Sequence, residues 1–141
     1  MVRIARIAFT GVAWLFLACV VAQVFLAGMA VFSNNDFATH RQFGYLFGIL
    51  TLALVLLAAA GRMGRRWIGG SALLLGLFAL QSVFIALRGS SPAVAALHAA
   101  NALAIFWVAQ GLARGSIGLI TAATPEAPIP SAGPGTAQAA D

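Results

Sequence analysis

The two histidines of the chain, His40 and His98, are the side chains best suited to hold a metal or a cofactor. Each follows a glutamine in an apolar segment and then a short polar loop. Gln23 and Gln81 are 58 positions apart, and so are His40 and His98. Imidazole is a usual axial ligand of haem iron and a common ligand of other metals. Two histidines in equivalent sequence positions therefore indicate that both could bind the same metal or cofactor.

The composition predicts that both histidines belong to a membrane protein. Of the 141 residues, 62% are hydrophobic and 8% are charged, whereas soluble domains have about 25% charged residues. Four apolar stretches are each close to the roughly 20 residues that a spanning helix needs, at about 7–32, 40–60, 67–87 and 93–113. Because lipid cannot satisfy open backbone groups, these spans must be helices. We therefore expect an all-α polytopic membrane protein, a four transmembrane helix bundle.

Arginine placement predicts the orientation of these helices. The net charge of +5 comes from eight arginines and no lysine. Arg41 and Arg88 fall on one side of the spans, and the other six fall on the opposite side: Arg3, Arg6, Arg62, Arg65, Arg66 and Arg114. The positive-inside rule assigns the larger group to the cytoplasm. Both termini would then be cytoplasmic, and both histidines would lie at the outer face.

The chain is predicted to have two parts. Residues 1–114 form the four-helix transmembrane domain, and residues 115–141, rich in Ala, Pro, Gly and Thr, form a disordered cytoplasmic tail. The arginines form no cluster long enough to indicate nucleic acid binding. The single cysteine, Cys19, excludes an intrachain disulfide and a cysteine-based zinc site.

The first two spans and the last two are predicted to be copies of one helical hairpin. Shifting the sequence by 58 positions aligns them without a gap and pairs identical residues: Gly11 with Gly69, Leu15 with Leu73, Gln23 with Gln81, Ser33 with Ser91, and His40 with His98. Two hairpins that enter the membrane from the same side are related by a pseudo-two-fold axis along its normal. His40 and His98 would therefore face each other at equal depth across this axis.

Haem b suits such a pair, because its iron has one open axial position on each face. His40 and His98 would be the ligands, and a flat ring needs room between the helices. Gly44 and Gly48 follow His40 at intervals of one helical turn, and small residues let a ligand approach the backbone. Phe43, Phe47, Phe106 and Trp107 are the predicted walls of the pocket.

Four further polar residues are candidates for contacts with the bound group. Arg41 and Arg88 are the outer arginines, and guanidinium groups suit the carboxylates of the haem propionates. Gln23 and Gln81 lie in the spans that precede the two histidines. They would either orient the ligand or form hydrogen bonds between helices.

Other interpretations of the same residues remain open. The histidines could be a structural polar pair at helix ends, and Asp36 could join them as a third ligand of zinc or instead cap the second span. A cofactor-free subunit would pack against a partner or a second copy through small-residue faces such as Gly44 with Gly48. A transporter is disfavoured, since the spans contain no acidic residue that would couple protons.

The chain resembles a group of small bacterial four-helix integral membrane proteins of unknown function and, more distantly, one four-helix half of a haem A synthase. Gln23, the pair His40-Arg41, Gln81 and the run LHAANALAIFWVA from Leu97 carry the resemblance, which covers about residues 7 to 113. It implies the bacterial cytoplasmic (inner) membrane and a haem held on its outer side by His40 and His98. Phe37 stands where the catalytic half of that family has a glutamate, so haem hydroxylation is not expected and no catalytic residue is assigned.

The sequence thus predicts an integral membrane haem b-binding protein with bis-histidine ligation, whose role is electron transfer. A quinone or a redox protein would be its electron partner, in the lipid bilayer, and a homo-oligomer is a further arrangement to test. The alternative is a cofactor-free structural or assembly subunit of a membrane complex. The paired histidines distinguish the two, because a structural bundle has no need of two equivalent ones.

Overall fold

The computed structural model describes residues 1–34 and 36–121 and is all-helical over them, as predicted. Four long helices dominate: α1 (Val2–Phe32), α2 (Ala38–Ala60), α3 (Arg65–Ala86) and α5 (Leu97–Thr121). Between α3 and α5 the chain forms a 3-10 turn, η1 (Leu87–Gly89), and a short helix, α4 (Pro92–Ala95). Within the described residues, four segments are long and apolar enough to cross a membrane, so the predicted all-α fold with four such helices is confirmed.

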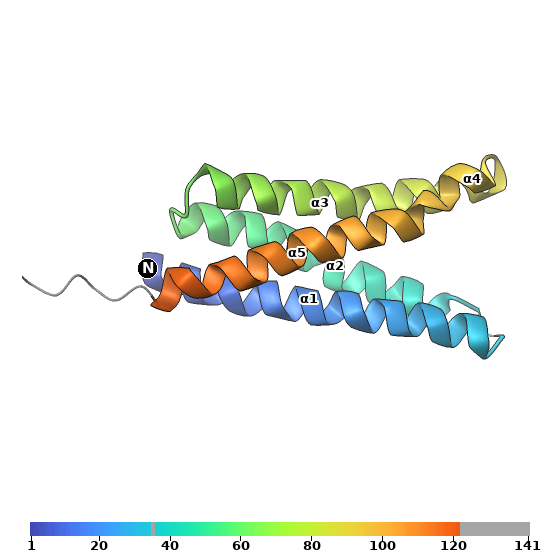
Figure 1. Cartoon of the computed structure of the whole chain (residues 1–141), viewed down its shortest axis with the longest axis horizontal. Coiled ribbons are helices and arrows are strands. Elements are labelled where there is room, and N and C mark those ends of the chain that lie inside the picture. The colour runs from blue at the N-terminus through green and yellow to red at the C-terminus, as the bar shows by residue number, and fades with distance from the viewer. Residues whose placement is uncertain (35, 122–141) are drawn as a thin grey trace, which may run out of the picture.

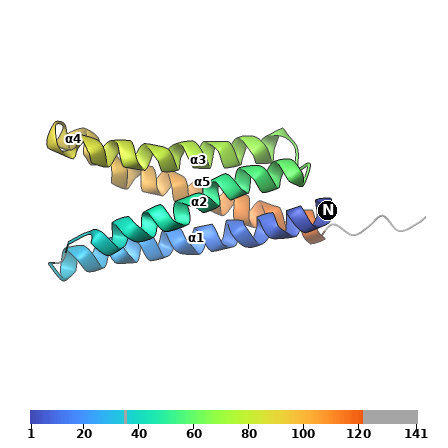
Figure 2. The same cartoon turned by 180° about the vertical axis from the view of Figure 1, so that it is seen from behind.

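The four long helices form a bundle in which each helix packs against two neighbours. Helix α1 contacts α2 and α5, and α3 contacts the same two helices, so α2 and α5 occupy diagonal positions. Figure 1 shows the two hairpins, α1–α2 and α3–α5, close together at the end that holds the N-terminus. They diverge toward the opposite end, and Figure 2 shows the same divergence from behind.

Residues that are 58 positions apart in the sequence also occupy equivalent positions in the packed bundle. Equivalent positions in the two hairpins are buried in pairs: Ala13 and Ser71, Phe16 and Leu74, Phe47 and Ile105, Thr51 and Ala109, Leu54 and Leu112, and Ala58 and Ser116. A pseudo-two-fold relation produces this pattern, because related residues have related surroundings. The two hairpins therefore contribute to the core with corresponding faces.

The core is concentrated toward the end of the bundle that holds the N-terminus. Four of its apolar side chains, Phe9, Phe16, Leu54 and Leu74, are 0% exposed. Toward the other end, residues 38–46 and 75–100 include no buried side chain. The diverging end, where both histidines lie, is therefore the less tightly packed part of the molecule.

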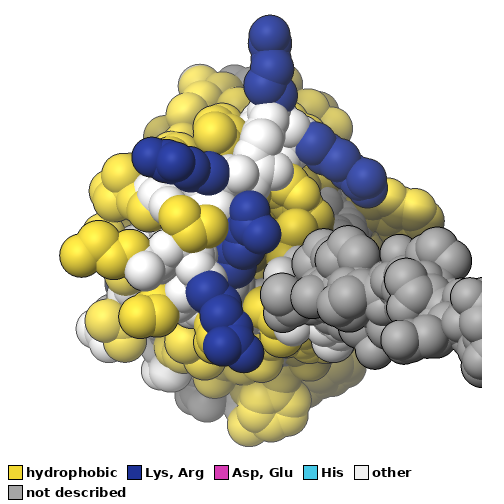
Figure 3. Space-filling model, turned by 90° about the vertical axis from the view of Figure 1, so that its left-hand side faces the viewer, with side chains coloured by type: hydrophobic (Ala, Val, Ile, Leu, Met, Phe, Trp, Pro, Cys, Tyr) yellow, Lys and Arg dark blue, Asp and Glu magenta, His cyan; other side chains and the backbone are white. Residues whose placement is uncertain are grey.

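Arginines gather at the tightly packed end of the bundle, as Figure 3 shows. One of them joins two helices, because Arg6 Nε donates a hydrogen bond to the Gly61 carbonyl at 3.0 Å. Nearby, Thr10 Oγ1 donates to the Ser116 carbonyl at 3.3 Å and so joins α1 to α5. The direction in which the bundle crosses a membrane remains a prediction from the distribution of these arginines.

The last helix is longer than the sequence indicated. A disordered tail was expected from residue 115, but α5 continues to Thr121, so this expectation is wrong for residues 115–121. Ser116 is 0% exposed, and its carbonyl accepts the bond from Thr10, which explains why the helix continues along α1. The rest of the predicted tail, residues 122–141, lies outside the described residues.

Gly48 tests the packing between α2 and α3. A Cβ atom on Gly48 would lie 2.6 Å from Cε1 of Phe78, whereas one on Gly11 would meet nothing within 4 Å. We expect Gly48→Ala to lower the free energy of unfolding by about 1–3 kcal/mol, the usual cost of overpacking. The control, Gly11→Ala, should be neutral or stabilising by up to about 1 kcal/mol. Thermal unfolding in detergent, followed by circular dichroism, measures both, and equal melting temperatures would contradict the packing described.

Candidate functional site

His40 and His98 lie side by side at the diverging end of the bundle. Their ring centroids are 6.2 Å apart, and the ring planes are inclined at 63°. His40 is in the first turn of α2 and His98 is in the first turn of α5. Since these helices are diagonal, the two imidazoles bridge the bundle from opposite corners. The structure therefore brings together the two residues that the repeat placed opposite each other.

The two imidazoles are oriented by equivalent hydrogen bonds. His40 Nδ1 is 3.1 Å from the Gln23 carbonyl oxygen, and His98 Nδ1 is 3.3 Å from the Gln81 carbonyl oxygen. A carbonyl oxygen only accepts, so Nδ1 must carry the hydrogen in both rings. In a neutral imidazole this leaves the Nε2 lone pair free for a metal or a hydrogen-bond donor. A histidine that binds a metal commonly donates its other N–H to such a partner.

The side chains of the two glutamines make different contacts. Gln23 Nε2 donates to the His40 carbonyl at 2.8 Å, while Gln23 Oε1 is buried without a hydrogen-bond partner in the described structure. Gln81 Oε1 instead accepts from Asn101 Nδ2 at 2.9 Å. Asn101 Nδ2 also lies 2.8 Å from the Leu77 carbonyl, to which it donates. Both glutamines thus connect the two helices of their own hairpin, and the main chain of each also fixes a histidine.

A cluster of aromatic rings forms the part of the core nearest the histidines. Phe47 is at its centre, with ring centroids 5.3 Å from Phe16, 5.3 Å from Phe43 and 5.2 Å from Phe78. Phe43 and Phe47 were predicted as walls of a pocket, whereas Phe78 was not. No sequence signal could identify Phe78, because its equivalent in the repeat is Val20. Trp107 is 76% exposed and faces away from the bundle, so its prediction as a wall is wrong.

The glycines of α2 receive side chains from neighbouring helices. A Cβ on Gly44 would lie 2.8 Å from Gln23 Nε2, and one on Gly48 would lie 2.6 Å from Phe78 Cε1. The small residues therefore let α1 and α3 approach α2, and the space beside them is filled by Gln23 and Phe78. Arg41 and Arg88 are exposed at the same end of the molecule as the histidines.

Asp36 acts at the beginning of α2 and does not complete a metal site. Its Oδ1 accepts a hydrogen bond from the Ala38 N–H at 3.1 Å, which is typical of a residue that starts a helix. Within residues 1–34 and 36–121, no three side chains among His, Cys, Asp and Glu come close enough to hold a metal ion together. The interpretation of Asp36, His40 and His98 as a zinc site is therefore wrong, and the helix-start interpretation agrees with the structure.

Comparison with known proteins gives one family match. Residues 23–87 match the model of a family described as "Family of unknown function (DUF6220)". The match includes Gln23, His40 and Gln81 but ends before His98. No curated protein matches the chain, and no solved structure matches it either. A domain of unknown function is thus found in the chain, and the four-helix bundle is consistent with the uncharacterised four-helix family that the sequence resembles.

The orientation of the two imidazoles can be tested by nitrogen NMR. Because both Nδ1 atoms face a carbonyl oxygen, we expect both neutral rings to be in the Nδ1–H form. Free histidine favours the Nε2–H form, so the nitrogen spectrum distinguishes rings that are held by these hydrogen bonds from rings that are not. Long-range proton–nitrogen correlation spectra of the ¹⁵N-histidine-labelled protein in detergent at alkaline pH measure this, and His40→Gln assigns the signals. Nε2–H rings would contradict the described hydrogen bonds.

Proposed function

We propose that this chain is an integral membrane haem b-binding protein in which His40 and His98 are the axial ligands. The main support is the pair of imidazoles held 6.2 Å apart by equivalent hydrogen bonds. Two imidazoles that bind one metal from opposite sides, each with about 2 Å between metal and nitrogen, have ring centres roughly 6 Å apart. The spacing and the free Nε2 atoms both suit this ligation.

The loose packing around the histidines supports a bound macrocycle. The hairpins diverge at this end (Figures 1 and 2), and residues 38–46 and 75–100, which surround the two histidines in the sequence, include no buried side chain. Within the described residues Gln23 Oε1 is buried without a hydrogen-bond partner, while Nε2 of the same side chain donates to the His40 carbonyl. A macrocycle beside α2 would also require Phe78 to move away from Gly48.

Electron transfer is the role that this ligand set favours. Bound haem would supply one-electron chemistry, and two histidine ligands leave no axial position for oxygen. The chain's own residues would orient the group: the Gln23 and Gln81 carbonyls hold the imidazoles, and the exposed Arg41 and Arg88 pair with the propionates. A quinone or a redox protein at this end of the bundle would exchange the electron.

A cofactor-free structural subunit is the second candidate. It is favoured by the contacts of Gly44 and Gly48, which Gln23 and Phe78 already fill, and by the hydrogen bonds of both glutamines within their hairpins. In this case the histidines would be helix-end polar residues of a small bundle. The two candidates differ in whether the purified protein holds haem.

Absorption spectroscopy tests the proposal directly. We expect the detergent-purified protein, expressed with added haem precursor, to show a sharp α-band after dithionite reduction, because both axial positions are filled by nitrogen. Replacement of either ligand by glycine, His40→Gly or His98→Gly, should abolish the low-spin spectrum, and added imidazole should restore it. Gln42→Ala, an exposed neighbour of His40, is the matched control and should leave the spectrum unchanged.

Two results would argue against haem ligation by this pair. A protein that stays colourless under these conditions, with the helical content of the folded bundle, would favour the structural subunit. A spectrum that persists in both glycine variants would place the haem elsewhere.

A further inference from the structure

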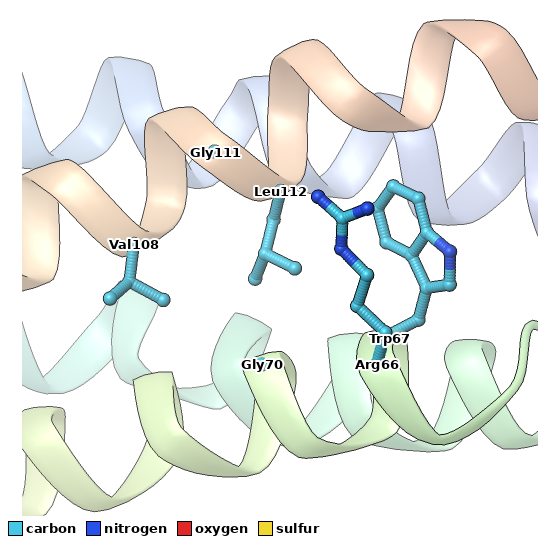
Figure 4. A pocket seen from close by; sticks show the side chains of 6 residues that line it. All are labelled: Arg66, Trp67, Gly70, Val108, Gly111 and Leu112. Atoms are coloured by element: carbon cyan, nitrogen blue, oxygen red, sulfur yellow. The ribbon is translucent and has the colours of Figure 1, made fainter.

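A second candidate site lies at the opposite end of the bundle, between α3 and α5. It is a groove of about 200 Å³ lined by Arg66, Trp67, Gly70, Val108, Gly111 and Leu112. Figure 4 shows that Arg66 and Trp67 come from the start of α3 and that Val108, Gly111 and Leu112 face them from α5. We refer to these six residues as the α3–α5 groove. It is separate from the histidine pair and does not depend on the proposed haem.

The floor of the groove is built by two reciprocal contacts. A Cβ on Gly70 would lie 3.1 Å from Cδ2 of Leu112, and a Cβ on Gly115 would lie 3.1 Å from the Trp67 ring. Leu112 of α5 thus packs beside a glycine of α3, and Trp67 of α3 packs beside a glycine of α5. Trp67 is also fixed from α1, since its ring centroid is 5.7 Å from that of Phe9 in an edge-on arrangement. The floor is therefore held in place from three helices.

Gly111 leaves open space on the wall of the groove. A Cβ on Gly111 would meet nothing within 4 Å, although the residue lies on the wall of the groove. The adjacent surface is apolar and exposed, with Ile68 37% and Trp107 76% accessible. In a bundle that spans a membrane, such a surface faces lipid, so hydrocarbon chains have direct access to the groove.

The mouth of the groove carries positive charge, and no acidic side chain of residues 1–34 and 36–121 lies near it. Arg66 is exposed at the start of α3, and Figure 4 shows its guanidinium reaching across toward α5. Within residues 1–34 and 36–121 Asp36 is the one acidic side chain, and it lies at the other end of the bundle. Arginine binds phosphate through several hydrogen bonds at once, and arginine beside tryptophan is typical of the membrane interface.

We propose that the α3–α5 groove binds one anionic phospholipid. Its phosphate pairs with Arg66, and the upper part of one acyl chain lies along Gly70, Gly111 and Val108. Charge complementarity selects an anionic headgroup, and the apolar floor selects a lipid over a soluble phosphate. Two substitutions separate these contributions, because Arg66→Gln removes the charge and Gly111→Phe fills the hollow.

Native mass spectrometry of the full chain, released from nanodiscs of equal parts phosphatidylglycerol and phosphatidylcholine, tests this proposal. We expect the wild type to retain one phosphatidylglycerol in at least fivefold preference over phosphatidylcholine. Arg66→Gln should reduce that preference to below twofold. Gly111→Phe should reduce retention of both lipids, because the ring occupies the space of the acyl chain.

Two controls make the outcome decisive. Arg3→Gln removes another exposed arginine from the same end, and Gly11→Phe places the same ring on open surface of α1. Both variants should retain lipid as the wild type does.

Equal retention of the two lipids by the wild type would overturn the proposal. An equal loss in Arg3→Gln and Arg66→Gln would also overturn it, since diffuse charge rather than a site would then explain the preference. Displacement of the lipid by glycerol phosphate would show that the groove takes a soluble anion.

Discussion

In the hydrocarbon of a membrane an unpaired polar group is costly, so backbone groups must find their partners within the protein, and the rest of the structure depends on this constraint. It makes the chain helical, and it also decides where the polar side chains lie. Thr10, Asn101 and Gln23 donate to carbonyls of neighbouring helices. The two histidines do the same through Nδ1. The hydrogen bonds that satisfy the imidazoles therefore also determine which nitrogen remains available for chemistry.

The two ends of the bundle differ in how closely the two hairpins approach each other. At the arginine-bearing end, Gly70 and Gly115 receive Leu112 and Trp67, and the helices interlock. At the other end the hairpins diverge, and an aromatic cluster centred on Phe47 closes the core below the histidines. A more tightly packed end and a more loosely packed end are therefore built from the same four helices. The loosely packed end is where a ligand can be accommodated with the smallest loss of packing.

The two hairpins are equivalent in how their histidines are hydrogen-bonded but differ in the contacts of their glutamine side chains. Both histidines bond to the main chain of the equivalent glutamine, but the equivalent of Asn101 is Phe43. Gln81 therefore has a side-chain partner that Gln23 lacks, and Gln23 Oε1 remains buried and unsatisfied. The two hairpins therefore differ in how their glutamine side chains are hydrogen-bonded within the described residues.

The sequence by itself determined the fold class, the four spans, the repeat and the pairing of His40 with His98, because these depend on hydrophobic length and on a register that does not change on folding. It could not determine that Phe78 fills the space beside Gly48, that Trp107 faces outward, or that α5 extends to Thr121. Those features depend on the rotation of each helix and on contacts between residues distant in sequence, such as Thr10 with Ser116. Only the tertiary structure decided that each Nδ1 faces a carbonyl and that a groove opens beside Gly111, since helix rotation and close packing set both.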